Sequence, residues 1–252
     1  FDASGKVTTP LDTAFKTKNE QGAAYNMKSK SGIGKEWNEQ AAAFAAYCVG
    51  KTSDEIGKIA VNEQGVPTGS DLTSSVTIHV GDFIKLVQKA IANAQDLGAK
   101  ASDKLGLGVV TSISDSKGAT ADAEGQAQGY STYAVVTVDS SNKITSCIID
   151  ASQSNVKFDA TGKITTDLTA ELKTKNELGA AYNMKSKSSI GKEWNEQAAA
   201  FAEYVVGKTV DEVEGIAVTE EGDAADEDLL ASVTVTISAF IDTIVKAFEF
   251  AR

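Results

Sequence analysis

Apolar residues follow the spacing of β-strands in the middle of the chain. Tyr133–Val138 and Ile144–Ile149 are rich in β-branched residues and flank the polar segment 139–143, so they predict a β-hairpin. Val156–Phe158 and Lys163–Thr165 flank the turn 159–162 and predict a second hairpin. An earlier run, Val109–Ile113, also has the composition of a strand.

From Leu168 onward the spacing of apolar residues becomes helical. One face repeats at i, i+4, i+7 and i+11 and is followed by Gly207, which predicts a helix that ends there. The members of this face are Trp194, Ala198, Phe201 and Val205. Thr209 and Glu212 have the spacing of a capping box, as do Thr52 and Glu55, and predict short helices. A final apolar stripe predicts a C-terminal helix and consists of Ile237, Phe240, Ile241, Ile244, Val245 and Phe248. Strands followed by helices predict an α+β fold in which helices pack on an antiparallel sheet.

One sequence unit occurs twice in the chain. Residues 1–95 align without a gap with residues 158–252 at a constant offset of 157 positions. Lys16–Tyr47 and Lys173–Tyr204 are identical at 29 of 32 positions, which indicates a duplication. The predicted organisation is the C-terminal part of a first repeat at 1–95, a linker at 96–103 and a complete second repeat at 104–252.

The two repeats differ in extent. Residues 104–157, which contain the predicted strands of the second repeat, have no counterpart in the first. The repeat pattern predicts that the missing half lies upstream of Phe1 in a longer chain. The alternative is that another copy supplies it in trans, as in donor-strand complementation, so self-association that completes the first repeat is a second expectation.

Composition narrows the classes of function. The net charge of −11 and the pI of about 4.7 disfavour binding to nucleic acid or to an anionic membrane surface. No apolar run approaches the roughly 18 residues that a transmembrane helix requires. Cys48 and Cys147 are too few for a disulfide scaffold and lack metal-ligand spacing, so each is predicted to be an isolated buried thiol. His79 is the only histidine and its repeat partner is Thr236, which argues against a histidine-based triad or metal site.

A candidate modification site lies between Val109–Ile113 and the polar stretch before Tyr133. Its sequence is Asp115-Ser116-Lys117-Gly118-Ala119-Thr120. A hydroxyl on an exposed loop suits an acceptor, Gly118 allows close backbone approach, and Ala119 adds little bulk. The Gly118-Ala119-Thr120 segment resembles the acceptor site of bacterial FMN-binding domains, where a flavin transferase joins the FMN phosphate to a threonine hydroxyl. The site departs from the family pattern at Lys117, where the family has serine.

A wider resemblance covers nearly the whole chain. The segments that carry it are Gly-Leu-Gly-Val-Val-Thr-Ser-Ile at 106–113, Val-Lys-Phe-Asp at 156–159, Lys-Thr-Lys-Asn-Glu-Leu-Gly at 173–179 and Ser-Ile-Gly-Lys-Glu-Trp at 189–194. They are similar to the repeat of the pheromone-encoding lipoprotein A type, two-domain surface flavoproteins of Gram-positive bacteria. The resemblance implies tandem FMN-binding-type domains, covalent FMN, a lipid anchor upstream of Phe1 and an extracellular, cell-surface location. It also implies electron relay between membrane or surface redox partners and extracellular acceptors, with FMN on Thr120 here.

The resemblance implies a second group of FMN-binding residues before and within the Trp194 helix. The group consists of Glu177, Leu178, Gly179, Tyr182, Met184, Gly191 and Trp194. Aromatic and thioether side chains suit a flat isoalloxazine ring, and Lys185, Lys187 and Lys192 could offset the phosphate charge. Core packing is the alternative for Trp194, because its helical spacing to Phe201 is that of an ordinary core face, and a solvated surface is the alternative for the lysines.

Three classes of function remain open at this point. The first is a covalent flavin electron carrier, in which the protein binds, orients and tunes the cofactor. The second is a flavin-dependent reductase of a small extracellular acceptor, which requires an open substrate pocket. The third is a structural surface repeat or filament subunit without flavin, suggested by the duplication.

Overall fold

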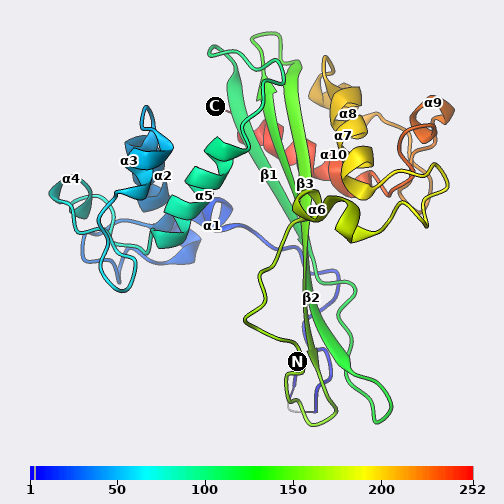
Figure 1. The fold of residues 1–252 in the computed structure, drawn as a ribbon, viewed down its shortest axis with the longest axis horizontal. Helices are drawn as coiled ribbons and strands as arrows, with labels where there is room; N and C mark the ends of the chain where they lie inside the picture. Colours follow the sequence, from blue (N-terminus) through cyan, green and yellow to red (C-terminus); the bar gives the residue numbers. More distant parts are fainter. Residues whose placement is uncertain (3, 252) are drawn as a thin grey trace. The chain divides into compact units, whose positions relative to one another are not determined.

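The computed structural model describes residues 1–2 and 4–251 and is a mixed α/β structure with one antiparallel sheet. The chain divides into two units (Figure 1). Unit 1 consists of Phe1–Phe15 and Leu97–Arg252, and unit 2 consists of Lys16–Asp96. Residues 1–15, which the repeat alignment places with 16–95, therefore group with the sheet.

The sheet of unit 1 has three strands in the order β1-β2-β3, namely β1 Lys104–Ser112, β2 Gly125–Val138 and β3 Ile144–Phe158. Both pairs are antiparallel, and the turn between β2 and β3 places Asn142 in the left-handed region at φ 59°. The predicted central hairpin is confirmed. The strands are longer than predicted, because β2 begins at Gly125 rather than Tyr133. The polar residues that precede Tyr133 pair with residues 151–158 of β3, which are also largely polar. These segments form strands through their hydrogen bonds to each other, and they lack the alternation of apolar residues from which a strand is predicted.

The turn at 159–162 is also confirmed. Asp159 N–H donates to the Lys163 carbonyl at 2.9 Å, and the Asp159 carboxylate accepts from the backbone of Thr161 and Lys163. Pairing beyond the turn is limited to one isolated bridge between Phe158 and Ile164. This second hairpin is therefore a tight turn with a short bridge rather than two further strands.

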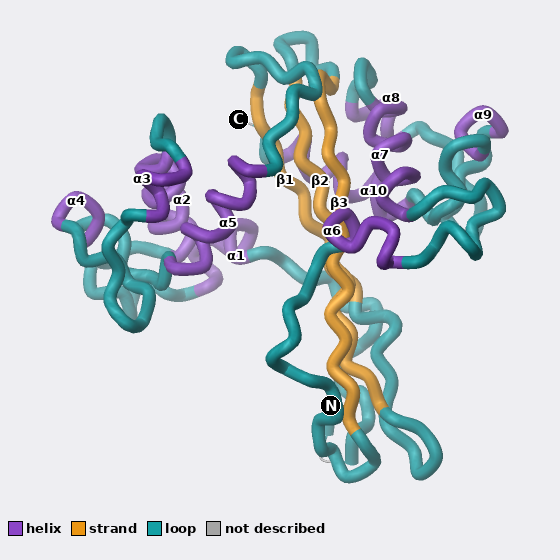
Figure 2. Tube along the Cα trace, viewed as in Figure 1, coloured by secondary structure: helices purple, strands orange, loops and turns teal. Residues whose placement is uncertain are grey.

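The helices of unit 1 follow the strands along the chain, and the longest of them pack on the sheet (Figures 1 and 2). They are α6 Lys175–Leu178, the 3₁₀ helix η2 Gly179–Tyr182, α7 Trp194–Val205, α8 Val210–Glu214, α9 Glu227–Leu230 and α10 Ser238–Glu249. The helix predicted to end before Gly207, the capping box of Thr209 and the apolar stripe of the last helix are all confirmed. Helix α7 packs on β3, and α10 packs on β1 and β2.

Helix α10 lies against the backbone of β1 because that strand has no side chains at the contact. Gly106 and Gly108 are the inward-facing residues, and an added Cβ would meet the backbone of Ala247 and Thr243. Lys246 Nζ donates to the Val109 carbonyl at 2.7 Å at the same contact. The two glycines therefore set how closely the last helix approaches the sheet.

A buried glutamine connects the helices to the loops that join them. The Gln197 side-chain carbonyl accepts from the backbone N–H groups of Thr234 and Val235, and its amide donates to Ser188 and Lys192. Gln197 is fully buried, so these bonds satisfy a polar group that would otherwise be costly. The apolar core around it includes Phe201, Phe240 and Ile244, and places Trp194 among buried residues.

Each helix of unit 2 begins and ends 157 residues before a helix of unit 1. They are α1 Lys18–Gln21, η1 Gly22–Tyr25, α2 Trp37–Cys48, α3 Ser53–Gly57, α4 Ser70–Thr73 and α5 Gly81–Ala92. Gln40 occupies the place of Gln197 and bonds Thr77, Ser31 and Lys35. Unit 2 therefore contains the helical half of the repeat with its own small core around Phe44.

The two cysteines differ in environment. Cys147 is buried on β3, as predicted, and burial raises the pKa of its thiol to about 12. Cys48 is only half-buried at the end of α2, so the prediction of a buried thiol is wrong for this residue. Its repeat partner is Val205, which is fully buried in unit 1.

Candidate functional site

The loop between β1 and β2 is held in place up to Lys117. The Ser116 hydroxyl is buried, where it donates to the Gln128 carbonyl at 3.2 Å and accepts from the Gln128 N–H at 3.0 Å. Lys117 then forms a backbone bridge with Gln126, with both hydrogen bonds present. The segment that follows, Gly118–Thr120, is therefore presented from a fixed base at the start of β2.

Thr120 lies at the exposed end of this loop. Its backbone N–H donates to the Ala123 carbonyl at 2.9 Å, and within the described residues its hydroxyl has no hydrogen-bond partner. By contrast, the hydroxyl of Thr161, in the nearby turn, donates to Asp159 at 2.6 Å. An exposed hydroxyl on a surface loop is accessible to a modifying enzyme.

Two close backbone approaches shape the loop beside Thr120. A Cβ added to Gly118 would lie 2.8 Å from the Gly5 carbonyl oxygen, so only glycine fits there without movement. Ala119 lies next to Gly5, and its backbone borders Gly125, which in turn faces the Phe158 ring. The small residues of Gly118-Ala119-Thr120 thus have a packing role in addition to the acceptor role that the sequence predicts.

A buried lysine lies further along β2 in a cage of aromatic rings, which we call the lysine cage and define as Lys175, Tyr130, Tyr182 and Trp194. Lys175 Nζ donates to the Tyr130 hydroxyl at 2.8 Å. The same nitrogen lies 4.7, 4.6 and 4.8 Å from the ring centroids of Tyr130, Tyr182 and Trp194. Lys175 is only 5% exposed, so the cation is stabilised by ring faces in place of water.

Burial dominates the electrostatics of the lysine cage. Desolvation lowers the pKa of Lys175 from 10.5 to about 8, and the nearby Asp150 carboxylate opposes this shift. Desolvation also raises the pKa of Tyr130 to about 12, with smaller contributions from Tyr182, Asp115 and Asp150. The cage therefore contains an amine that loses its proton at lower pH than an ordinary lysine, beside a phenol that keeps its proton to higher pH than an ordinary tyrosine.

The Lys175 shift predicts a rise in stability with pH. Between pH 8 and 10.5 the unfolded chain holds a proton on Lys175 that the folded chain has lost, so the free energy of unfolding increases across this window. The full shift corresponds to about 3 kcal/mol. Above pH 10 the raised pKa of Tyr130 acts in the opposite direction, because the unfolded phenol ionises first.

Urea unfolding of unit 1 at a series of pH values measures this effect. Lys175→Met is expected to remove the rise between pH 8 and 10. Lys18→Met, at the exposed counterpart in unit 2, should leave the profile unchanged. Equal slopes for the wild type and Lys175→Met would show that this lysine is not the titrating group.

The structure brings together only some of the residues predicted to bind FMN. Tyr182 and Trp194 meet in the lysine cage, and Trp194, which also contacts Phe240 edge to face, belongs to the core as the alternative interpretation holds. Asp115 is exposed but close enough to Tyr130 for its charge to affect that phenol. Met184 packs at the margin of the core, and its N–H donates to Glu193 at 2.9 Å.

The remaining predicted residues have local backbone roles in the structure. Glu177 completes a capping box with Thr174 at the start of α6, and Leu178 precedes η2. Gly179 and Gly191 adopt positive φ values of 48° and 63°. Their conformations shape the turns on either side of Tyr182 and Met184.

Sequence reasoning missed Lys175 and Tyr130. Lys175 lies at the start of a helix, where a lysine is ordinarily solvated, so the sequence gives no sign that it is buried. Tyr130 lies among polar residues, so the sequence gives no sign that it belongs to a strand. The available signal was the recurrence of Lys, Tyr and Trp at 175, 182 and 194 and at 18, 25 and 37. In unit 2 the same three residues meet, with Lys18 Nζ 5.0 Å from the rings of both Tyr25 and Trp37.

The acceptor loop and the lysine cage lie along the same strand. Lys117 is bridged to Gln126, and Tyr130 follows four residues later on β2. The acceptor loop and the lysine cage therefore lie at successive positions along the first half of β2.

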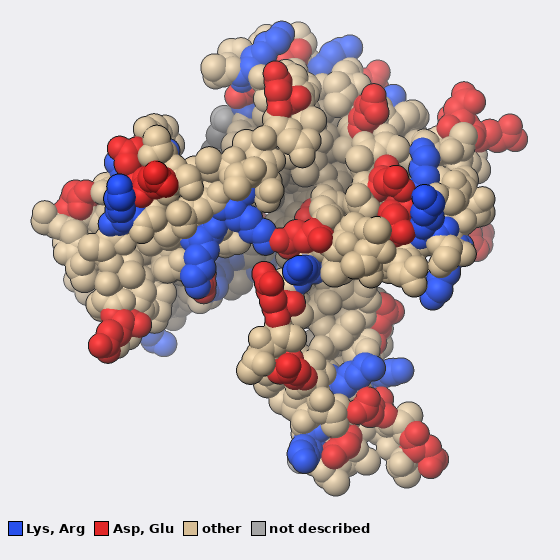
Figure 3. All heavy atoms as spheres, viewed as in Figure 1, with Lys and Arg blue, Asp and Glu red and all other residues tan. Residues whose placement is uncertain are grey.

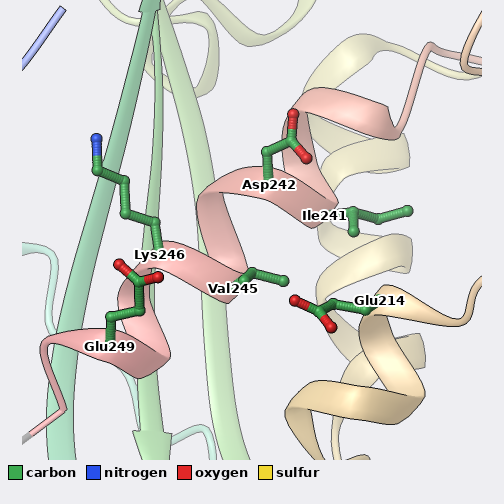
Figure 4. Close-up of a pocket in the computed structure, with 6 residues that line it drawn as sticks. All are labelled: Glu214, Ile241, Asp242, Val245, Lys246 and Glu249. Atoms are coloured by element: carbon green, nitrogen blue, oxygen red, sulfur yellow. The ribbon is translucent and has the colours of Figure 1, made fainter.

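A separate surface depression lies away from the acceptor loop and the lysine cage. A depression of about 390 Å³ between α8 and α10 is lined by Glu214, Ile241, Asp242, Val245, Lys246 and Glu249 (Figure 4). None of these residues belongs to the acceptor loop or the lysine cage. Within residues 1–2 and 4–251, no group of three or more His, Cys, Asp or Glu side chains is arranged to hold a metal ion.

Surface charge agrees with the acidic composition. On the face shown in Figure 3, basic and acidic side chains are interspersed rather than gathered into a basic patch. His79, predicted to have a surface or packing role, is exposed. In the described part of the chain, no helix combines the length and hydrophobicity needed to cross a bilayer.

Comparison with protein-family models, curated proteins and solved structures finds no match to this chain.

Proposed function

We propose that the protein is a flavoprotein electron carrier in which FMN is joined through its phosphate to Thr120. The observation that carries the proposal is the Thr120 hydroxyl, exposed at the end of a fixed loop and without a hydrogen-bond partner among the described residues. The small residues Gly118 and Ala119 leave room beside it. In this proposal each repeat is an FMN-binding-type domain, and unit 1 holds the acceptor.

The lysine cage supports a flavin rather than another phosphate-linked group. FMN supplies the ability to take up and release electrons, while the protein supplies binding, orientation and electrostatic tuning. Tyr182 and Tyr130 are partly exposed aromatic side chains that suit contact with a flat ring system, and Lys175 provides a positive charge near the same position. Asp115, whose charge reaches Tyr130, would border the ribityl part, whose hydroxyls can donate to its carboxylate.

The family resemblance favours a carrier over a reductase. A reductase of a small acceptor requires a substrate pocket next to the cofactor. The depression in Figure 4 lies between α8 and α10 and shares no residue with the cage. Transfer between protein partners needs only an accessible cofactor, which an exposed Thr120 would provide.

The resemblance extends the proposal to location and partners. A flavin transferase would load Thr120, and membrane or surface redox partners would donate electrons that pass to extracellular acceptors. The protein would act outside the cell, held at the surface through a lipid anchor. The acidic surface would favour partners with basic docking surfaces over nucleic acid.

The test is to produce the full chain together with a flavin transferase and record its visible spectrum and intact mass. We expect a yellow protein whose mass exceeds that of the sequence by one FMN residue, with fragmentation locating the addition to Thr120. A colourless chain of unmodified mass under these conditions would contradict the proposal. It would favour a structural surface repeat instead.

A further inference from the structure

Unit 2 presents an apolar helix face that its counterpart in unit 1 buries against the sheet. Thr243 is fully buried in α10, whereas the equivalent Leu86 of α5 is 60% exposed. Ala247 and Ala202 are buried, whereas Ala90 and Ala45 are exposed. The exposed face of unit 2 is therefore formed by the positions that touch β1, β2 and β3 in unit 1.

The rest of unit 2 is packed as in unit 1. Gln40, Ile56 and Val76 are as fully buried as Gln197, Val213 and Val233. The hydrogen bonds of Gln40 to Thr77, Ser31 and Lys35 repeat those of Gln197. Exposure is thus confined to one face of an otherwise complete helical core, which is the pattern of an interaction surface.

Polar groups on the same face have partners in unit 1 that they lack in unit 2. In unit 1, Asn176 donates through its side chain to the Ile149 carbonyl at 2.9 Å and through its N–H to Asp150 at 3.0 Å. In the described part of unit 2, the identical residue Asn19 forms neither bond.

The end of the long helix shows the same contrast. Gly207 N–H donates to the Ile144 carbonyl at 2.8 Å, and Ile144 N–H donates to the Lys208 carbonyl at 2.9 Å. Gly50 and Lys51 occupy these positions in unit 2 without a strand partner among the described residues. A strand beside α2 would satisfy both groups.

The lysine cage is also incomplete in unit 2. Lys18 lies over Tyr25 and Trp37, as Lys175 lies over Tyr182 and Trp194. The third ring of the complete cage, Tyr130, comes from β2 of the sheet. Lys18 is exposed where Lys175 is buried, so the missing part is a tyrosine on a strand.

We propose that this face of unit 2 binds a second three-stranded antiparallel sheet of the same kind as β1–β3, with the sequence of a further copy of the 104–157 segment. That sheet would cover Leu86 and Ala90, accept from Asn19, pair with Gly50 and Lys51, and bring a tyrosine to Lys18. Every one of these contacts has a realised equivalent in unit 1. The inference is independent of flavin binding.

The test attaches residues 101–157 directly before Phe1, which preserves the repeat offset of 157 positions. Hydrogen exchange, followed by mass spectrometry, compares α5 peptides in the 252-residue chain and in the extended chain. We expect exchange of the α5 amides to slow by at least about tenfold in the extended chain, since α5 would become buried as α10 is. The matched variant Leu86→Asp should cancel the gain and leave the 252-residue chain unaffected, because Leu86 is exposed there.

Two outcomes would overturn the proposal. One is unchanged exchange of α5 in the extended chain, whether or not the added strands are themselves protected. The other is a concentration-dependent dimer of the 252-residue chain in sedimentation that Leu86→Asp abolishes, which would assign the face to a second copy. A 252-residue chain that stays monomeric, together with slowed exchange in the extended chain, is the expected result.

Discussion

Thr120→Val is expected to abolish covalent flavin attachment completely when the chain is produced with a flavin transferase. Valine has the shape of threonine but no hydroxyl, so the phosphoester bond has no acceptor oxygen. The substitution is expected to cost little stability, because the Thr120 side chain is exposed and its hydroxyl has no partner within the described residues. Flavin absorbance after denaturation and removal of free FMN gives the measurement.

Thr161→Val is the matched control for this prediction. Thr161 also follows an alanine and lies in an exposed turn, but its hydroxyl donates to Asp159. Flavin attachment to Thr161→Val should therefore equal that of the wild type. Loss of flavin from both variants, or from neither, would place the acceptor elsewhere or exclude covalent attachment.

Ala247→Asp is expected to destabilise unit 1 by about 4 kcal/mol or more, since it places a charge with no partner between α10 and β1. Ala247 is fully buried. Its backbone is so close to Gly106 of β1 that a Cβ atom added to Gly106 would collide with it. An aspartate there must remain unpaired or separate the helix from the strand.

The repeat provides the control for this substitution. Ala90→Asp makes the same change at the same place in α5, so helix propensity and helix-dipole effects are matched. Ala90 is exposed, so its replacement should cost only the helix-propensity and helix-dipole effects, about 1 kcal/mol. Hydrogen exchange resolves the two units separately, and similar losses in both variants would contradict the difference in burial.

Much of the fold could be predicted because its pattern is local. The stripe of α10, the face of α7 and the capping boxes of Thr52 and Thr209 depend on spacing within one helix. The start of β2 could not, because Gly125–Ser131 are strand residues only through pairing with β3 and carry no apolar alternation. Pairing between distant polar segments leaves little trace in either sequence.

The site was predictable only in part for the same reason. Gly118-Ala119-Thr120 lies in one contiguous loop, so its small residues and hydroxyl can be recognised from the chain alone. The lysine cage joins Tyr130 of β2 to Lys175 of α6, residues 45 positions apart. The low pKa of Lys175 arises from burial under that tyrosine and two other rings, which no spacing rule gives.

The hydrogen bonds along the outer edge of β3 also hinder the addition of another strand at that edge. An uncovered edge strand offers free N–H and carbonyl groups to other chains and invites aggregation. Along β3 these groups are occupied at Ile144 by Gly207 and Lys208, and at Ile149 by Asn176. At Lys157 the N–H donates to Thr166 and the carbonyl accepts from Thr165. Strand addition from another molecule is therefore blocked at intervals along this edge, so concentrated protein should resist fibre formation through β3.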